Sequence, residues 1–287
     1  MSAGVLGLLL AAAVAHAAWN LTAKRLAGDP RVIVSLYAAG SLVVIAPFGV
    51  WQWAHHGWAV SPVLLLAPLA SGALRNLYAL ALQAGYARAD LGVVYPTARG
   101  VGPSVAMVLA VVVLGERPPL LALAGGAVVI LGIAVVTGGL AVLRRPAVAT
   151  GLMFGALSGL GIAGYTVLDG WAVGTEHVPP LTFLMLAEAA SVVILAPAWW
   201  PGRRHARDLV RARPSTFAAV WLLMPLSYGL VLWCLRTTDV SIVAPVRECS
   251  IVIGALAAGL LYKEAHLRRR VLGSLVVLGG IALVSAG

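Results

Sequence analysis

The chain has 287 residues, of which 61% are hydrophobic and 10% are charged, and its formal net charge is +10. Soluble domains are about 45–50% apolar and about 25% charged, so this composition excludes a soluble globular enzyme, a disordered chain and a nucleic-acid-binding domain. The positive charge is instead typical of arginines that hold the loops of a membrane protein on one side of the bilayer.

The first apolar run, residues 4–23, is long enough to cross a bilayer. It contains Ala15-His16-Ala17, which resembles a signal-peptide cleavage pattern, but residues 1–15 contain no Lys or Arg. A signal peptide needs a positively charged amino-terminal region. We therefore expect this run to be the first membrane helix.

Further apolar runs of about 20 residues follow, separated by charges or prolines. They predict an all-α integral membrane protein with ten transmembrane helices. The predicted helices span residues 4–23, 32–51, 62–85, 91–114, 120–140, 149–170, 180–199, 215–235, 240–261 and 269–286. The segment from Pro201 to Pro214 is predicted as a basic loop against anionic lipid. The fifth and tenth helices carry only small and aliphatic core residues, so we expect them at the periphery, against lipid or a second protomer.

Metal and disulfide chemistry is not expected. Cys234 and Cys249 lie in apolar runs and lack the spacing of a metal site, and the pair His55-His56 has no further ligands nearby in the sequence. We therefore expect no metal, no disulfide and no cofactor.

The sequence repeats itself at an offset of 149 residues. The matching positions are His16 and Tyr165, Asn20 and Asp169, Pro96 and Pro245, and Arg99 and Glu248. After a one-residue deletion, Glu116 matches Glu264. We expect two five-helix repeats, residues 1–143 and 144–287. Because five is an odd number, the second repeat would enter from the opposite face, which relates the halves by a pseudo-two-fold axis in the membrane plane.

Two short motifs complete a pattern found in a known family. Ala17-Ala18-Trp19-Asn20 lies in the first helix, and Leu114-Gly115-Glu116 closes the fourth. With these motifs, ten predicted helices and an internal repeat, the chain resembles the EamA-domain branch of the drug/metabolite transporter superfamily. This resemblance implies a carrier of small metabolites, including amino acids and amphipathic drugs. It also implies a central cavity lined by the first four helices of each half.

Charged side chains inside the predicted helices are the first candidates for a site, because a charge at a helix centre costs about 2.5–3.5 kcal/mol on insertion scales. Other polar and aromatic residues share faces with them at helical spacing. The candidates for substrate binding are His16, Trp19, Asn20, Arg75, Tyr78, Tyr95, Arg99, Tyr165 and Glu248, and the candidates for coupling or ion pairing are Asp169, Glu188 and Arg247.

Two interpretations of these residues are open. In one, arginines attract an anionic group of the substrate and aromatic rings stack on its apolar part. In the other, internal ion pairs, such as Arg247 with Glu188, only hold helices together. We expect Arg75 to be the best single anion-binding residue, because no acid lies near it in its own helix. We also expect the deep charges to be net positive, and we expect Arg99 and Glu248, at matched positions of the repeat, to act as a symmetry-related pair.

The leading functional hypothesis is a secondary transporter, proton-coupled or facilitative, of a small amphipathic metabolite with an anionic group, such as an amino acid. The alternative is an integral membrane enzyme such as a lipid-modifying transferase, which the scattered acids favour less. We expect no enzyme activity, no nucleic-acid partner, a monomer or homodimer, and a multi-pass location in the cell membrane, the inner membrane in a bacterium.

Outside the predicted helices, all basic residues except Arg117 and Arg236 lie in connections on one side. This bias places both termini outside, whereas the resemblance implies cytoplasmic termini.

Overall fold

The computed structural model describes all residues except 24–25, 27, 138–147 and 254–266. Within the described part every regular element is a helix. The helices of the first half are α1 (Ala3–Ala23), α2 (Pro30–His55), α3 (Pro62–Tyr86), α4 (Leu91–Val112) and α5 (Leu120–Thr137). Those of the second half are α6 (Val148–Gly170), which continues into the π-helix η2 (Trp171–Thr175), α7 (Pro180–Trp199), α8 (Arg203–Ala212), α9 (Pro214–Cys234), α10 (Val240–Arg247) and α12 (Leu267–Ala286).

Proline marks the start of several helices. Pro30, Pro62 and Pro180 occupy the first helical turn of α2, α3 and α7, where the absent N–H has no helical partner to lose. Two of these starts are also capped by side chains. The carboxylate of Asp29 accepts from the amide of Arg31 at 2.8 Å, and Ser61 Oγ accepts from the amide of Leu64 at 3.1 Å.

Six helical stretches in the described residues are long and apolar enough to cross a membrane. They are Ala3–Ala23, Pro30–His55, Pro62–Tyr86, Val148–Thr175, Pro180–Pro197 and Pro214–Cys234, and shorter apolar stretches lie at Leu120–Val136 and Val271–Ala286. Many large apolar side chains on the outside of the bundle are exposed, Leu120 by 83% and Val43 by 75%. A membrane-spanning, all-helical fold is therefore confirmed, while the ten-helix inverted repeat stays a prediction.

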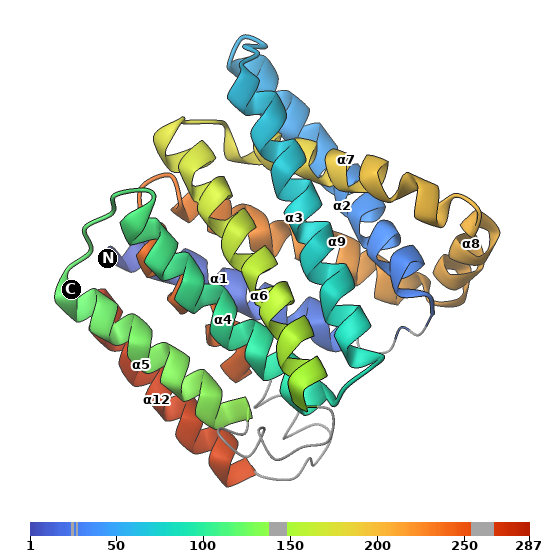
Figure 1. The fold of residues 1–287 in the computed structure, drawn as a ribbon. Coiled ribbons are helices and arrows are strands. Elements are labelled where there is room, and N and C mark those ends of the chain that lie inside the picture. Colours follow the sequence, from blue (N-terminus) through green and yellow to red (C-terminus); the bar gives the residue numbers. More distant parts are fainter. Residues whose placement is uncertain (24–25, 27, 138–147, 254–266) are drawn as a thin grey trace.

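The basic segment between the seventh and eighth predicted spans was predicted as a loop, and this prediction is wrong. Residues Arg203–Ala212 form the helix α8, which lies at one edge of the bundle (Figure 1). Arginine, alanine and leucine are strong helix formers, and Pro214 begins α9 in its first turn. The flanking prolines delimit a short helix here and do not prevent one.

The ninth predicted span, residues 240–261, is not one continuous helix over its described part. Helix α10 ends at Arg247, and Glu248 lies in a turn before helical residues resume at 249–253. Pro245 lacks an N–H and crowds the preceding turn. The backbone tightens there, because Glu248 donates to the carbonyl of Pro245 at 3.1 Å and Ile251 to that of Glu248 at 2.9 Å. Residues 254–261 lie outside the described residues.

Helices α5 and α12 lie side by side at an edge of the bundle opposite α8 (Figure 1). Glycines allow this close approach: a methyl group added to Gly125 would lie 2.7 Å from the carbonyl oxygen of Gly280, and one added to Gly273 would lie 3.0 Å from that of Gly132. The expected peripheral position of these two helices is confirmed. Polar side chains from α1, α3, α4, α6, α7, α9 and α10 meet in the remaining core.

Candidate functional site

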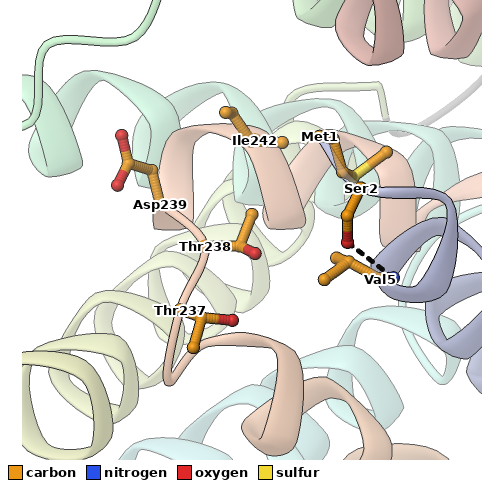
Figure 2. Close-up of a pocket in the computed structure, with 7 residues that line it drawn as sticks. All are labelled: Met1, Ser2, Val5, Thr237, Thr238, Asp239 and Ile242. Atoms are coloured by element: carbon orange, nitrogen blue, oxygen red, sulfur yellow. Dashed lines mark hydrogen bonds between the residues drawn. The ribbon is translucent and has the colours of Figure 1, made fainter.

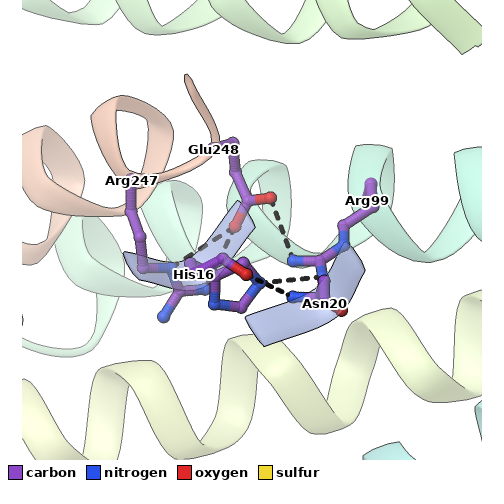
Figure 3. Close-up of polar contacts among 5 residues, drawn as sticks. All are labelled: His16, Asn20, Arg99, Arg247 and Glu248. Carbon is purple, nitrogen blue, oxygen red and sulfur yellow. Dashed lines mark hydrogen bonds and ion pairs between the residues drawn. The ribbon is translucent and has the colours of Figure 1, made fainter. Parts of the chain in front are cut away.

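Four side chains from α1, α4 and the end of α10 meet around one carboxylate, and we call them the Glu248 cluster: His16, Arg99, Arg247 and Glu248 (Figure 3). Glu248 Oε2 accepts from Arg99 Nη1 at 3.2 Å, and Glu248 Oε1 accepts from Arg247 Nη2 at 3.2 Å. Arg99 Nη2 lies 3.3 Å from His16 Nε2. Asn20 donates to the carbonyl oxygen of His16 at 2.8 Å. The turn at Glu248 thus places its carboxylate between the two arginines.

The Glu248 cluster has more donors than its one carboxylate can accept. A guanidinium carries five N–H donors and no acceptor, so His16 Nε2 must be the acceptor in its contact with Arg99. Arg99 is 5% exposed and Glu248 is 1% exposed. With all side chains except His16 ionised, the cluster carries one excess positive charge. Such an arrangement suits an additional carboxylate or phosphate.

A second group of side chains has an excess of negative charge. We call it the Arg75 cluster, and it consists of Arg75, Asp169, Glu188 and Tyr228. Arg75 Nη2 donates to Asp169 Oδ2 at 2.9 Å, and Arg75 Nη1 lies 3.5 Å from Glu188 Oε1. Tyr228 Oη donates to the same Asp169 oxygen at 2.6 Å, and the Arg75 guanidinium lies 4.0 Å from the centre of the Tyr228 ring. Helices α3, α6, α7 and α9 each contribute one of these residues.

The Arg75 cluster has one guanidinium for two carboxylates, and hence one excess negative charge when all three are ionised. Asp169 Oδ1 is buried and has no hydrogen-bond partner, and neither has Thr166 Oγ1 one helical turn away on α6. A buried polar atom without a partner costs about 1–3 kcal/mol. Asp169 and Thr166 therefore offer free acceptors that suit a proton or an ammonium group.

Tyr165 lies between the two clusters. Its ring centre is 5.3 Å from the guanidinium carbon of Arg75 and 5.9 Å from that of Arg247. The ring also contacts those of Tyr78 and Tyr228, at centroid distances of 6.3 and 5.8 Å. Both clusters thus lie against the ring of Tyr165.

Some of the sequence-based pairings are confirmed and others are wrong. The expected pair of Arg99 with Glu248 forms. The pair of Arg247 with Glu188 does not, since Arg247 binds Glu248 and Glu188 contacts Arg75.

Arg75 has no acid in its own helix, as the sequence indicates, but Asp169 and Glu188 reach it from α6 and α7. Asp169 was placed near a helix end, but η2 extends α6 beyond it and Asp169 is 0% exposed. The net positive excess predicted for the deep charges is therefore wrong, since the two clusters together hold three arginines and three acids.

The remaining candidate residues surround the clusters. Tyr95 lies under the guanidinium of Arg99, with its ring centre 5.3 Å away. The Trp19 ring makes edge contacts with His16 and Tyr37 at centroid distances of 5.2 and 6.2 Å. Trp19 Nε1 is buried and has no hydrogen-bond partner, so it is one more donor turned toward the core near the Glu248 cluster.

Sequence reasoning missed Tyr228 and the role of Glu116. Tyr228 is a single tyrosine in an apolar helix, and no pattern set it apart. Glu116 was identified only as part of a motif, yet its two carboxylate oxygens accept from the amides of Val240 and Ser241 at 2.7 and 2.9 Å. It thereby caps α10, the helix that leads to Glu248.

Replacing Glu116 with glutamine is expected to lower the free energy of unfolding by about 1 kcal/mol, because an amide oxygen is a weaker cap than a carboxylate and only one remains. Denaturant unfolding in detergent measures this change. The matched control is Glu176→Gln, whose side chain is exposed. An equal effect of both variants would contradict the capping role.

Two cavities lie away from the clusters. One, of about 390 Å³, lies at the amino-terminal ends of α1 and α10 (Figure 2). It is lined by Met1, Ser2, Val5, Thr237, Thr238, Asp239 and Ile242. Burial and the nearby Glu116 carboxylate raise the pKa of Asp239, which lies in the loop before α10. The other, of about 280 Å³, is apolar and lies between α3 and the end of α6.

Among the described residues, no three His, Cys, Asp or Glu side chains are grouped so as to hold a metal ion.

Comparisons with known proteins agree with this architecture. Residues 149–286 match the model of the EamA-like transporter family. The second half of the chain thus matches this family. A crystal structure of a protein with 16% sequence identity covers 100% of this chain and 98% of its own, with a TM-score of 0.74, and this similarity shows the fold. A comparison with curated proteins gives no match. The apolar helices make the chain a multi-pass membrane protein, and the family match indicates a membrane transporter of small molecules.

Proposed function

We propose that this EamA-like transporter carries a small zwitterionic metabolite, such as an amino acid with an apolar side chain, and binds it between the Glu248 cluster and the Arg75 cluster. The observation that carries the proposal is the opposite charge balance of two buried clusters that both lie against the ring of Tyr165. A zwitterion carries both charges that the clusters leave unmatched.

Each end of such a substrate has a defined partner. The substrate carboxylate binds the donors of Arg99 and Arg247 that Glu248 does not use. The substrate ammonium donates to Asp169 Oδ1, the buried carboxylate oxygen that has no partner. Apolar parts of the substrate stack on Tyr165, whose ring faces both clusters. Pairing both ends of a zwitterion offsets the cost of removing its charges from water.

The architecture that we propose around this site is that of ten transmembrane helices in two inverted repeats, residues 1–143 and 144–287. Helices that would be equivalent pack against each other, α2 against α7 and α5 against α12. The family match, which begins at residue 149, fits a second repeat of this length. The contact of Arg99 with Glu248, which are 149 residues apart, joins two matched positions. In such transporters the substrate site lies near the midplane between the repeats.

Glu188 is the proposed coupling residue. It contacts Arg75 at 3.5 Å without a hydrogen bond, whereas Asp169 is held by both Arg75 and Tyr228. Two carboxylates and one guanidinium in a buried site are disfavoured when all are charged, and the less firmly held carboxylate takes the proton most easily. In this proposal, a proton on Glu188 and the substrate ammonium compete for the same excess negative charge.

A matched ligand series tests the proposed substrate class. Leucine, isocaproate and isoamylamine share one branched apolar chain, but carry both charged groups, only the carboxylate and only the ammonium, respectively. Leucine is expected to raise the melting temperature of the detergent-purified protein more than either single-charge analogue at equal concentration, because it pairs with both clusters. Equal stabilisation by leucine and isocaproate would contradict the role of the Arg75 cluster, and no stabilisation by any of the three would contradict the proposed substrate.

A further inference from the structure

The proposed repeats make two helix seams equivalent, and the two differ in how closely they pack. The offset of 149 residues relates the seam between α4 and α6 to the seam between α10 and α1. Helices α4 and α6 pack along much of their length, whereas the eight residues of α10, Val240–Arg247, make few contacts with α1. The cavity of about 390 Å³ opens beside this second, loosely packed seam.

A glycine stripe explains the close packing of α4 with α6. A methyl group added to Gly151, Gly155 or Gly159 would lie 2.7, 2.6 and 2.7 Å from atoms of α4. The nearest atoms belong to Val93, Thr97 and Val101, respectively. Real side chains almost never approach so closely, so this seam depends on the absence of side chains at three positions one turn apart.

The equivalent positions on α1 carry larger side chains than glycine. The positions 149 residues before Gly151, Gly155 and Gly159 are Ser2, Leu6 and Leu10. Two of these three positions on α1 thus carry leucine where α6 carries glycine. The glycines that α1 does carry, Gly4 and Gly7, lie elsewhere on the helix, and a methyl group added to either would meet no atom within 4 Å. The difference between the two seams is therefore encoded in the sequence.

The two helices beside the cavity, α1 and α10, also carry His16 and Arg247 of the Glu248 cluster. The cavity wall includes Val5 of α1 and Ile242 of α10 (Figure 2). Along α10, Glu248 is six residues or about 9 Å beyond Ile242, and along α1, His16 is eleven residues or about 16 Å beyond Val5. Both helices that line the cavity thus run from it to the cluster that binds the substrate carboxylate in our proposal.

The wall of the cavity suits a polar solute. The exposed side chains of Ser2, Thr237 and Asp239 and the half-buried Thr238 supply hydroxyl and carboxylate oxygens. Val5 of α1 and Ile242 of α10 supply the apolar part of the cavity wall. A zwitterion with an apolar side chain finds partners for its ammonium group and for its side chain in this cavity.

We propose that the cavity between α1 and α10 is the vestibule through which a small zwitterionic substrate reaches the Glu248 cluster, and that the glycine-zipped seam between α4 and α6 is its closed counterpart. The proposal rests on the proposed function for the identity of the substrate. The unequal seams bias the protein toward the conformation that is open at α1 and α10. The opposite conformation requires α4 and α6 to separate.

Thiol labelling at two equivalent positions tests the open and closed seams. Ile242→Cys places a thiol in the vestibule, and Val93→Cys places one at the matched position of the α4–α6 seam, where Val93 is 0% exposed. Both variants are labelled in detergent with a charged maleimide, so that either side of the protein is accessible. Mass spectrometry locates the label, and the buried native Cys234 and Cys249 serve as internal references.

Ile242→Cys is expected to react at least about tenfold faster than Val93→Cys, because the closed seam must open locally before its thiol can react. Equal rates, or a faster reaction of Val93→Cys, would overturn the proposal. In a second pair of variants, Leu6→Gly is expected to slow labelling of Ile242→Cys, because it restores the missing glycine of α1. Gly155→Leu is expected to speed labelling of Val93→Cys. No change in either rate would show that the glycine stripe does not set the bias.

Blocking the vestibule tests whether substrate passes through it. Thr238→Trp is expected to slow leucine uptake into proteoliposomes by at least about tenfold, since it fills a cavity whose opposite wall is α1. The control is Val60→Trp, at a position that is 62% exposed in the connection between α2 and α3. Equal uptake by both variants would overturn the vestibule as the path. If the unsubstituted protein takes up no leucine but the labelling rates differ as expected, the substrate assignment fails and the asymmetry of the seams stands.

Discussion

Arg75→Leu is expected to lower the free energy of unfolding by about 3–5 kcal/mol, the cost of removing one partner from a buried ion pair. Arg75 is the one guanidinium that faces the carboxylates of Asp169 and Glu188, whose side chains are 0% and 4% exposed. Without it, two carboxylates remain buried with only the hydroxyl of Tyr228 as a donor. Guanidinium unfolding in detergent, followed by tryptophan fluorescence, measures the loss.

Two further variants separate charge from packing at this position. Arg75→Lys keeps the positive charge and is expected to retain most of the stability, although it loses the second contact of the planar guanidinium. Arg75→Leu combined with Asp169→Asn and Glu188→Gln removes all three charges and is expected to recover much of the stability that Arg75→Leu loses. If the triple variant is no more stable than Arg75→Leu alone, the loss arises from packing and the electrostatic explanation is wrong.

Glu248→Ala is expected to destabilise the protein by a similar amount, about 3–5 kcal/mol, because it leaves Arg99 and Arg247 facing each other without a counter-charge. The cavity left by the side chain is bounded by both guanidiniums. Acetate is therefore expected to bind there and to restore part of the lost stability, by about 1–3 kcal/mol at concentrations well above its dissociation constant. The melting temperature in sodium acetate, compared with sodium chloride at equal ionic strength, measures the rescue.

The unsubstituted protein is the control, and acetate should stabilise it far less than it stabilises Glu248→Ala. Equal effects of acetate on the two proteins would contradict the role of Glu248 as the shared counter-charge. A charge exchange of Arg99→Glu with Glu248→Arg is not expected to restore stability, because it places an arginine directly beside Arg247. The exchange therefore tests the three-residue arrangement and not an isolated pair.

The sequence predicted the parts of this fold that depend on local patterns. Apolar runs of sufficient length predicted most of the helices, and prolines such as Pro62 and Pro180 marked their starts. The matched positions of Arg99 and Glu248 suggested a symmetric pair, and the two side chains are in contact at 3.2 Å. Such predictions succeed because helix length, helix starts and repeat offsets are all properties of neighbouring or regularly spaced residues.

The sequence could not supply the partners that join different helices. Arg75 has no acid within reach on α3, and only the packing of α3 against α6 and α7 brings Asp169 and Glu188 to it. Tyr228 carries no local signal, since a tyrosine in an apolar helix is common. The turn at Glu248 was missed for a related reason. Pro245 signals a disturbed helix, but the sequence does not show whether the helix bends or breaks.

In the proposed transport cycle, two oppositely charged clusters bind the two ends of one zwitterion. Uptake of radiolabelled leucine into proteoliposomes that contain only this protein, with unlabelled isocaproate or isoamylamine as competitors, tests this claim most directly. We expect leucine uptake that unlabelled leucine inhibits strongly and that each single-charge analogue inhibits only weakly, because each analogue pairs with one cluster. Absence of leucine uptake, or inhibition by isocaproate as strong as that by leucine itself, would contradict the claim.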